Sequence, residues 1–289
     1  MEIYIENEHL RASFSAKGAE LQHLCGVDSG TEYLWRGDPA YWPKFSPVLF
    51  PIVGAIRDNQ YRYQGKVYTL PRHGFARDMV FEVTKPNDLE LLFTLRHSEQ
   101  TLKVYPFPFT LSIRYQLSAA TLTCCYEVSN PADNVLWFSI GGHPAFAAPL
   151  NNEGRYSDYF LTFDADDILT FYPIQDNFLS DETSTLVLQD KKLFLKHELF
   201  YKDALVFKDL KSRSISLMNT RNYNGINFKF DNFPYFGIWA ARDADFVCLE
   251  PWCGIADTQE PYQDLSEKEG MNCLASGEVW TRSWQITCF

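Results

Sequence analysis

The chain lacks any cluster of positive charge. Its 289 residues carry a formal net charge of −11 and a pI near 5.0, and Lys and Arg form no basic run. Nucleic acids and anionic membrane surfaces are both bound through clustered Lys and Arg. We therefore expect no nucleic-acid partner and no membrane partner.

Long apolar runs are also missing. No stretch of about 18 apolar residues, the length that spans a bilayer, occurs in the sequence. The first residues, MEIYIENEHLRASF, carry acids where a secretory signal carries basic residues, and they alternate between apolar and polar side chains. We expect a cytoplasmic protein.

Cysteines are few and do not form a recognisable framework. There are seven, an odd number, and Cys124, Cys125, Cys248 and Cys288 lie inside apolar, strand-like runs. Such cysteines are typical of small core side chains in a reducing compartment. Cys248 and Cys253 lie close together, but no second pair with a histidine at zinc spacing follows, so we expect no structural metal.

What the sequence does contain is apolar and aromatic residues in short alternating runs. Apolar residues make up 46% and aromatic residues 16%, which is enough for a large core. Runs such as EIYIEN, LELLFTLRH and TLTCCYEVSN predict strands, and Gln64–Gly65 between Tyr61–Tyr63 and Lys66–Leu70 predicts a hairpin. The segment Leu186–Phe200 has the spacing of one short helix.

These elements predict an all-β fold with very little helix. A large antiparallel β-sandwich and a β-propeller both use many short strands, but a propeller needs a blade repeat of about 40–50 residues, which is not present. The sequence also has no flexible linker, and large sandwiches of roughly 200–250 residues fold as one unit. We predict a single β-sandwich domain over residues 1–289.

Two titratable residues lie where apolar strands are expected to end. His143 follows two glycines and precedes Pro144, while Glu250 follows the apolar run FVCL and precedes Pro251. Each residue alone is also compatible with a polar group that binds a neighbouring loop. Together they are a candidate acid–base pair.

Four motifs occur in an order that resembles the aldose 1-epimerase (galactose mutarotase) superfamily. They are Arg57 in VGAIRDNQ, His73 in PRHGFARD, His143 in IGGHPAF and Glu250 in VCLEPW. The resemblance spans nearly the full chain and implies a galactose mutarotase-like supersandwich with an open cleft across one sheet and no metal or organic cofactor. The residues HGFAR are most similar to a LacX-like or hexose-6-phosphate-mutarotase-like branch.

The resemblance implies an isomerase that interconverts the α and β anomers of an aldohexose. One group must remove the proton of the C1 hydroxyl while another protonates the ring oxygen, after which the ring opens, rotates about C1–C2 and closes. The resemblance assigns Glu250 as the base and His143 as the acid, on opposite sides of the sugar. His73 is expected to contact the ring oxygen or a neighbouring hydroxyl.

Four more residues are expected at the sugar. Arg57 would bind hydroxyls through its forked donors, Asp203 would accept hydrogen bonds from hydroxyls, and Trp239 would offer a flat apolar face. Arg77 would line the cleft, and with Arg57 and Arg72 it would hold the phosphate of a hexose 6-phosphate. Each of three residues also has a purely structural alternative. Asp203 could be an acid in a surface turn, Trp239 could be an ordinary core residue, and Arg77 could form an ion pair with a neighbouring acid.

Other functions remain open from the sequence. A non-catalytic sugar-binding or sensor protein would keep the same fold, and a hexose-6-phosphate mutarotase would keep the same chemistry. A glycoside hydrolase would need two carboxylates, Glu250 and Asp203, and would leave the histidines unused. A monomer and a homodimer are both compatible with the sequence.

Overall fold

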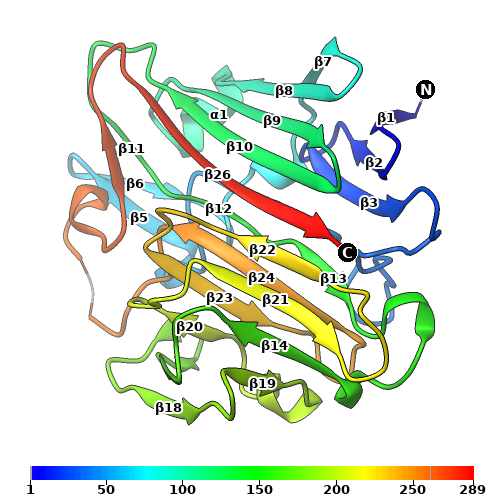
Figure 1. Cartoon of the computed structure of the whole chain (residues 1–289). Coiled ribbons are helices and arrows are strands. Elements are labelled where there is room, and N and C mark those ends of the chain that lie inside the picture. Colours follow the sequence, from blue (N-terminus) through cyan, green and yellow to red (C-terminus); the bar gives the residue numbers. More distant parts are fainter. Residues whose placement is uncertain (1, 261) are drawn as a thin grey trace.

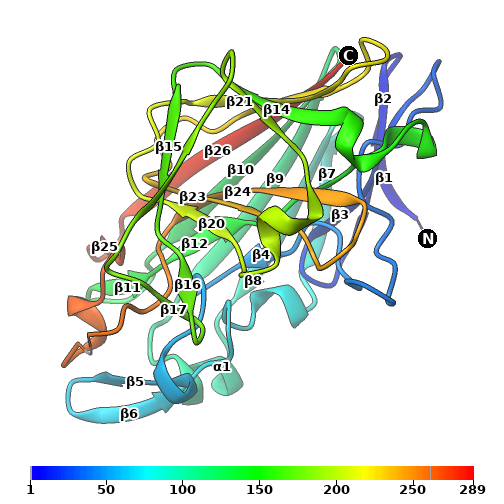
Figure 2. The ribbon, with the colours of Figure 1, turned by 90° about the horizontal axis from the view of Figure 1, so that it is seen from below.

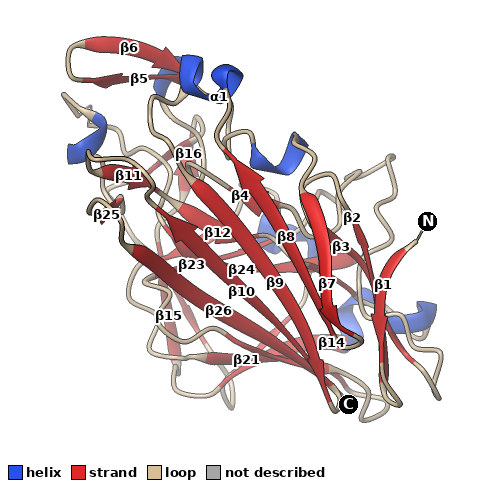
Figure 3. Cartoon of the chain, turned by 90° about the horizontal axis from the view of Figure 1, so that it is seen from above, coloured by secondary structure: helices blue, strands red, loops and turns tan. Residues whose placement is uncertain are grey.

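A computed structural model of the protein describes residues 2–260 and 262–289, and its regular secondary structure is mostly β-strand (Figure 3). The largest sheet is antiparallel and has nine strands. In spatial order they are β19 (Lys192–Phe194), β14 (Tyr159–Phe163), β21 (Ser214–Asn219), β22 (Ile226–Lys229), β26 (Val279–Cys288), β10 (Thr121–Ser129), β9 (Thr110–Ser118), β8 (Glu90–Arg96) and β7 (Glu82–Asn87). Figure 1 shows β26 crossing the molecule between β10 and β22.

A second antiparallel sheet has six strands. Five follow the order β20 (Leu205–Phe207), β23 (Tyr235–Trp239), β24 (Phe246–Cys253), β12 (Ile140–Gly142) and β4 (Val48–Leu49), and β13 (Ala145–Ala147) pairs with β24. Figure 2 shows β23 and β24 crossing in front of the long strands of the larger sheet.

Smaller sheets and short helices surround these two sheets. The small sheets are formed by β1 (Ile3–Glu6), β2 (Leu10–Ser15) and β3 (Glu20–Gly26); by β5 (Gln60–Tyr63) and β6 (Lys66–Thr69); by β11 (Leu136–Phe138) and β25 (Asn272–Leu274); by β15 (Ile168–Phe171) and β18 (Ser184–Val187); and by β16 (Ile174–Gln175) and β17 (Phe178–Leu179). The helical segments are α1 (Glu99–Val104) and 3-10 turns at Arg57–Asn59, Ala76–Asp78, Leu150–Asn152, Tyr156–Asp158, His197–Phe200 and Leu265–Glu267. Within the described residues, no helix is long and apolar enough to cross a bilayer.

The two large sheets pack face to face through aromatic side chains. The rings of Phe230, which follows β22, and Phe236 on β23 lie 4.1 Å apart, and those of Phe228 and Phe146 lie 5.8 Å apart. Side chains along the full length of β10 alternate between buried and half-buried. Every second residue therefore faces the core, and the larger sheet has one core face. The predicted all-β antiparallel sandwich with very little helix is confirmed.

Two local predictions are wrong. Leu186–Phe200 contains the end of β18, strand β19 and a 3-10 turn, and the α-helix lies instead at Glu99–Val104, where Ser98 and Thr101 form a reciprocal capping box. The strand before Glu250 does not end at Pro251, because β24 continues to Cys253.

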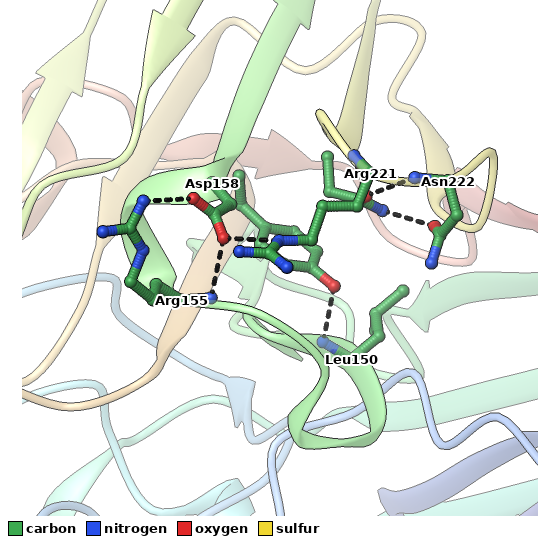
Figure 4. A network of polar contacts seen from close by, with 7 residues as sticks. Leu150, Arg155, Asp158, Arg221 and Asn222 are labelled. Carbon is green, nitrogen blue, oxygen red and sulfur yellow. Dashed lines mark hydrogen bonds and ion pairs between the residues drawn. The ribbon is translucent and has the colours of Figure 1, made fainter.

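Hydrogen bonds to one carboxylate fasten the turn that leads into β14 (Figure 4). Asp158 accepts the backbone N–H of Arg155 at 3.0 Å and the guanidinium groups of Arg155 and Arg221 at 3.1 and 2.8 Å. These hydrogen bonds, the backbone one first, lower the pKa of Asp158 to about 2. The turn is thereby tied to the loop that follows β21.

Candidate active site

A cavity of about 340 Å³ lies over one face of the six-stranded sheet. Its walls come from β23, β24, the break after β12 and loops distant in sequence. Six of the seven predicted site residues line it: His73, Arg77, His143, Asp203, Trp239 and Glu250.

Strand β24 supplies the floor of the cavity. Glu250 and Trp252 are two residues apart, so their side chains lie on the same face of the strand. Neighbouring strands carry glycine beside the Trp252 indole, because a Cβ added to Gly141 or Gly237 would lie 2.5 or 2.6 Å from this ring. The two glycines therefore make room for the indole beside the carboxylate.

His143 lies directly opposite Glu250 in the sheet. Strands β12 and β13 pair with β24 in the same register, with Gly141 opposite Trp252 and Ala145 opposite Cys248. This register places His143 across from Glu250, and His143 Nε2 lies 3.1 Å from Glu250 Oε2 without hydrogen-bond geometry. The pair is thus side by side on one wall, not on opposite sides of the cavity as we expected.

The pairing between β12 and β24 also explains why a proline, Pro251, is tolerated inside β24. Leu249 donates its backbone N–H to Pro144 O at 3.1 Å, so the backbone nitrogen of Pro251, two residues on, faces the same neighbour. On this side Pro251 lies opposite Gly142, the last residue of β12, and the β12–β24 pairing ends one residue earlier, at Gly141 opposite Trp252. The missing N–H of Pro251 therefore costs no regular sheet hydrogen bond.

Burial favours the uncharged forms of both members of the pair. Glu250 and His143 are 1% and 8% exposed. Burial raises the pKa of Glu250 well above its usual range, although the nearby positive charge of Arg72 opposes the rise. Burial also lowers the pKa of His143 to about 3. Between these pKa values the pair holds one proton.

Two tryptophans hold the His143 imidazole. The Trp42 ring stacks on it with centroids 4.9 Å apart, and the Trp239 ring meets it edge-on at 5.7 Å. These rings restrict the imidazole to one orientation and keep its surroundings apolar. Trp239 therefore lines the cavity and also packs against the core.

His73 is fixed by reciprocal hydrogen bonds with Gly54. The Gly54 N–H donates to His73 Nδ1 at 3.1 Å, and the His73 N–H donates to Gly54 O at 2.9 Å. Burial and the neighbouring His143 lower the pKa of His73 well below its usual range. We assign the neutral tautomer with the proton on Nε2, which leaves that nitrogen as a donor.

Charged residues form the polar part of the cavity wall. Arg72 Nη2 lies 3.9 Å from Asp203 Oδ2, and Arg77 Nη2 donates to Arg72 O at 2.8 Å. Burial lowers the pKa of Arg77. Its buried Nε has no hydrogen-bond partner among the residues that the structure describes. Arg77 also lies 3.8 Å from Asp78, the ion pair considered as its alternative.

Arg57 is the one predicted site residue that the structure places elsewhere. Its guanidinium donates to Gln259 O at 2.8 Å and lies over the Phe178 ring at 4.6 Å. It lines a separate pocket together with Asp257 and Tyr262. The placement of Arg57 in contact with the sugar is therefore not supported, because packing on Phe178 directs its donors away from the cavity.

Two tryptophans of the cavity, Trp42 and Trp252, were not predicted, and Arg72 was expected only as part of a phosphate site. Trp42 lies in the proline-rich segment PAYWPKFSP, where only the aromatic content indicated a buried ring. Arg72 directly precedes His73 in the sequence, and Trp252 follows Glu250 by two residues. Adjacency to the predicted acid, base and histidine was the signal that could have identified them.

Sequence comparisons with known proteins identify a family. The aldose 1-epimerase family model matches residues 1–287. The chain is 32% identical over 302 aligned residues to Protein LacX, chromosomal, of Lactococcus lactis subsp. lactis, with 99% of each chain covered.

Solved structures show the same fold. A galactose mutarotase related enzyme from Lactobacillus acidophilus superimposes with a TM-score of 0.95 at 33% identity, covering 100% of this chain and 97% of the other. A galactose mutarotase-like protein from Lactobacillus casei gives a TM-score of 0.93 at 29% identity, with both chains fully covered. The chain belongs to the aldose 1-epimerase family.

Proposed function

We propose that this protein is a mutarotase that interconverts the α and β anomers of an aldohexose in the cavity over β23 and β24. One observation carries the proposal. Glu250 and His143, a buried carboxylate and a buried imidazole, lie 3.1 Å apart on neighbouring segments of the sheet at the cavity. Family membership supports a sugar as the substrate.

The side-by-side arrangement suits the chemistry of a hemiacetal. The C1 hydroxyl and the ring oxygen are attached to the same carbon atom, so two adjacent catalytic groups can each reach one of these oxygens. Glu250 takes the proton of the C1 hydroxyl and His143 donates a proton to the ring oxygen. After rotation about C1–C2 the two groups exchange roles and the ring closes.

The single proton of the pair is what this reaction needs. A pair with two protons has no base, and a pair with none has no acid. Burial raises the pKa of Glu250 and lowers that of His143, so the one-proton state spans a wide pH range. The two groups lie 3.1 Å apart, and once they turn into hydrogen-bond geometry, transfer of that proton gives the carboxylate–imidazolium pair that opens the ring.

The remaining walls offer the contacts that a hexose requires. The Trp239 and Trp252 rings supply apolar faces for the sugar C–H groups. His73 Nε2–H donates to the ring oxygen or a neighbouring hydroxyl, while Arg72 and Asp203 bind hydroxyls. All seven cysteines lie in the described part of the chain and are free thiols, which supports a reducing compartment such as the cytoplasm.

A hexose 6-phosphate is the second candidate substrate. Arg72 and Arg77 both reach the cavity, as a phosphate site would require. A neutral sugar remains our first choice, because Arg72 lies beside Asp203 and Arg77 Nη2 donates to Arg72 O. A carboxylate next to the arginine disfavours a second anion.

Polarimetry with fresh α-D-glucose, α-D-galactose and a hexose 6-phosphate tests the function and the substrate together. Glu250→Gln and His143→Asn should each lower the rate of anomer equilibration at least about a hundredfold. Glu8→Gln and His9→Asn, at exposed positions near the N-terminus, are the matched controls and should retain the wild-type rate.

The outcomes separate the alternatives. Binding of a sugar without acceleration would indicate a sugar sensor, and release of a reducing end from a glycoside would indicate a hydrolase. Wild-type turnover by Glu250→Gln or His143→Asn would contradict the role assigned to that residue.

A further inference from the structure

One buried thiol beside the proton-transfer pair has no role in the proposed reaction. Cys248 is on the same strand as Glu250, two residues away, and is fully buried. A sulfur of Cys248, a ring nitrogen of His143 and a carboxylate oxygen of Glu250 all lie within 4.8 Å of one another. Three different metal-ligand types thus converge on one point.

The sheet itself holds these three side chains together. Alternation along β24 puts Cys248 and Glu250 on the same face, and the shared register of β12 and β13 puts His143 opposite Glu250. Cys248 is opposite Ala145 on one side and Trp239 on the other. Neighbouring strands position all three ligands, and no flexible loop is required.

Unsatisfied polar atoms at this point indicate a ligand. Glu250 Oε2 is buried and has no hydrogen-bond partner within residues 2–260 and 262–289, and the same is true of His143 Nδ1. Buried polar atoms are normally paired, so an unpaired carboxylate oxygen needs an explanation. A cation bound between Glu250, His143 and Cys248 would supply the missing partner of Oε2.

The donor set matches one class of metal ion. Thiolate, imidazole and carboxylate together suit Zn²⁺, whereas Mg²⁺ and Ca²⁺ prefer oxygen ligands. Zinc bond lengths of about 2.0–2.3 Å in a tetrahedral site correspond to ligand atoms roughly 3.3–3.8 Å apart. The three ligand atoms lie within 4.8 Å of one another, so binding would draw the side chains together by up to about 1.5 Å.

We propose that Cys248, His143 and Glu250 form a site for one Zn²⁺ ion and that zinc inhibits the enzyme there. The thiol of Cys248 and the carboxyl group of Glu250 release their protons, and His143 binds through the lone pair of one ring nitrogen. Two anionic ligands neutralise the ion, which favours burial of the complex. The fourth position faces the cavity and takes a water molecule.

Inhibition follows from the identity of the ligands. Zinc occupies the lone pairs with which Glu250 would accept a proton and the nitrogen from which His143 would donate one. This half of the inference rests on the proposed function. The metal site itself does not, so binding and activity are measured separately.

Binding is tested on the full chain with Co²⁺, which takes zinc sites and gives a thiolate-to-cobalt absorption band in the near ultraviolet. The wild-type protein should show this band at one equivalent of Co²⁺, and Zn²⁺ should displace it. Cys248→Ala should lose the band. Cys273→Ala is the matched control and should retain it, because Cys273 is an exposed thiol that does not belong to the cluster.

Activity is tested by polarimetry on metal-free protein with and without one equivalent of Zn²⁺. Zinc should slow wild-type equilibration at least tenfold, and a chelator should restore the rate. Each variant is compared with its own metal-free rate, and Cys248→Ala should lose the zinc sensitivity. If Cys248→Ala does not fold, Cys248→Ser replaces it. The zinc affinity of Glu250→Gln is then measured as well, and it should be at least tenfold lower than that of the wild-type protein.

Three results would overturn the site: no stoichiometric binding, an unchanged cobalt band in Cys248→Ala, or loss of the band in Cys273→Ala. Stoichiometric zinc binding by a protein with no metal-free activity would refute the proposed function and leave the metal site standing. Full metal-free activity without zinc binding would refute the metal site alone.

Discussion

A buried ion pair behind the cavity provides a quantitative test of the structure. Lys268 Nζ lies 2.9 Å from Asp257 Oδ1 and donates to Ile255 O at 2.7 Å, and the two side chains are 1% and 5% exposed. Ile255 and Ala256, which precede Asp257, line the cavity. The pair therefore anchors part of the cavity wall.

Replacing Lys268 with Met keeps most of the apolar stem and removes the ammonium group. Asp257 would keep one hydrogen bond, from the backbone N–H of Arg57 at 2.9 Å, but would lose its buried cation. Leaving a buried charge uncompensated typically costs about 3–5 kcal/mol. We expect the free energy of unfolding to fall by that amount in urea denaturation followed by tryptophan fluorescence.

Lys229→Met is the matched control. Lys229 lies 3.0 Å from Asp231, at almost the same separation, but these side chains are 52% and 49% exposed. Such a pair contributes at most about 1 kcal/mol. The double variant Lys268→Met/Asp257→Asn, which keeps an acceptor for the Arg57 N–H without a charge, should recover part of the loss. An equal loss in Lys268→Met and Lys229→Met would refute the reasoning.

Three further predictions concern the cavity. In a pH profile, kcat/KM should fall on the alkaline side at a pH well above 4.5. The reason is that burial raises the pKa of Glu250, and the pair loses its one proton only when Glu250 ionises. A fall near pH 4.5 would contradict this assignment. In steady-state assays, Arg72→Met should raise KM about tenfold or more, because a charged hydrogen bond to the sugar is lost. Arg57→Met should change KM little, because Arg57 lines a separate pocket. Equal effects of the two variants would contradict the placement of Arg57 outside the cavity. Trp42→Ala should lower kcat by up to about tenfold through loss of the ring stacked on His143, and an unchanged kcat would show that stacking does not position the imidazole.

Most strands could be predicted from the sequence because alternation is a local property. Segments such as Thr121–Ser129 place every second side chain in the core, and the hairpin at Gln64–Gly65 has a turn of the expected length. The wrong helix in Leu186–Phe200 has a local cause as well. A few apolar residues at helical spacing also suit a short strand followed by a 3-10 turn, and pairing with β14 decides between them.

The strand end at Pro251 could not be judged from the sequence. Proline normally ends a central strand, and that rule holds when both neighbours are continuous. In this protein Pro251 lies opposite Gly142, at the point where the β12–β24 pairing ends, so the strand continues. Only the pairing of segments far apart in the chain reveals this.

The amino-acid sequence was sufficient to identify the fold class, the family resemblance and the types of residue in the site, since each depends on residue patterns along the chain. The placement of those residues was decided by tertiary structure. Strand register brought His143 against Glu250 and put Cys248 beside them, and packing on Phe178 kept Arg57 out of the cavity. Register and packing join residues far apart in the sequence, and no local pattern encodes such contacts.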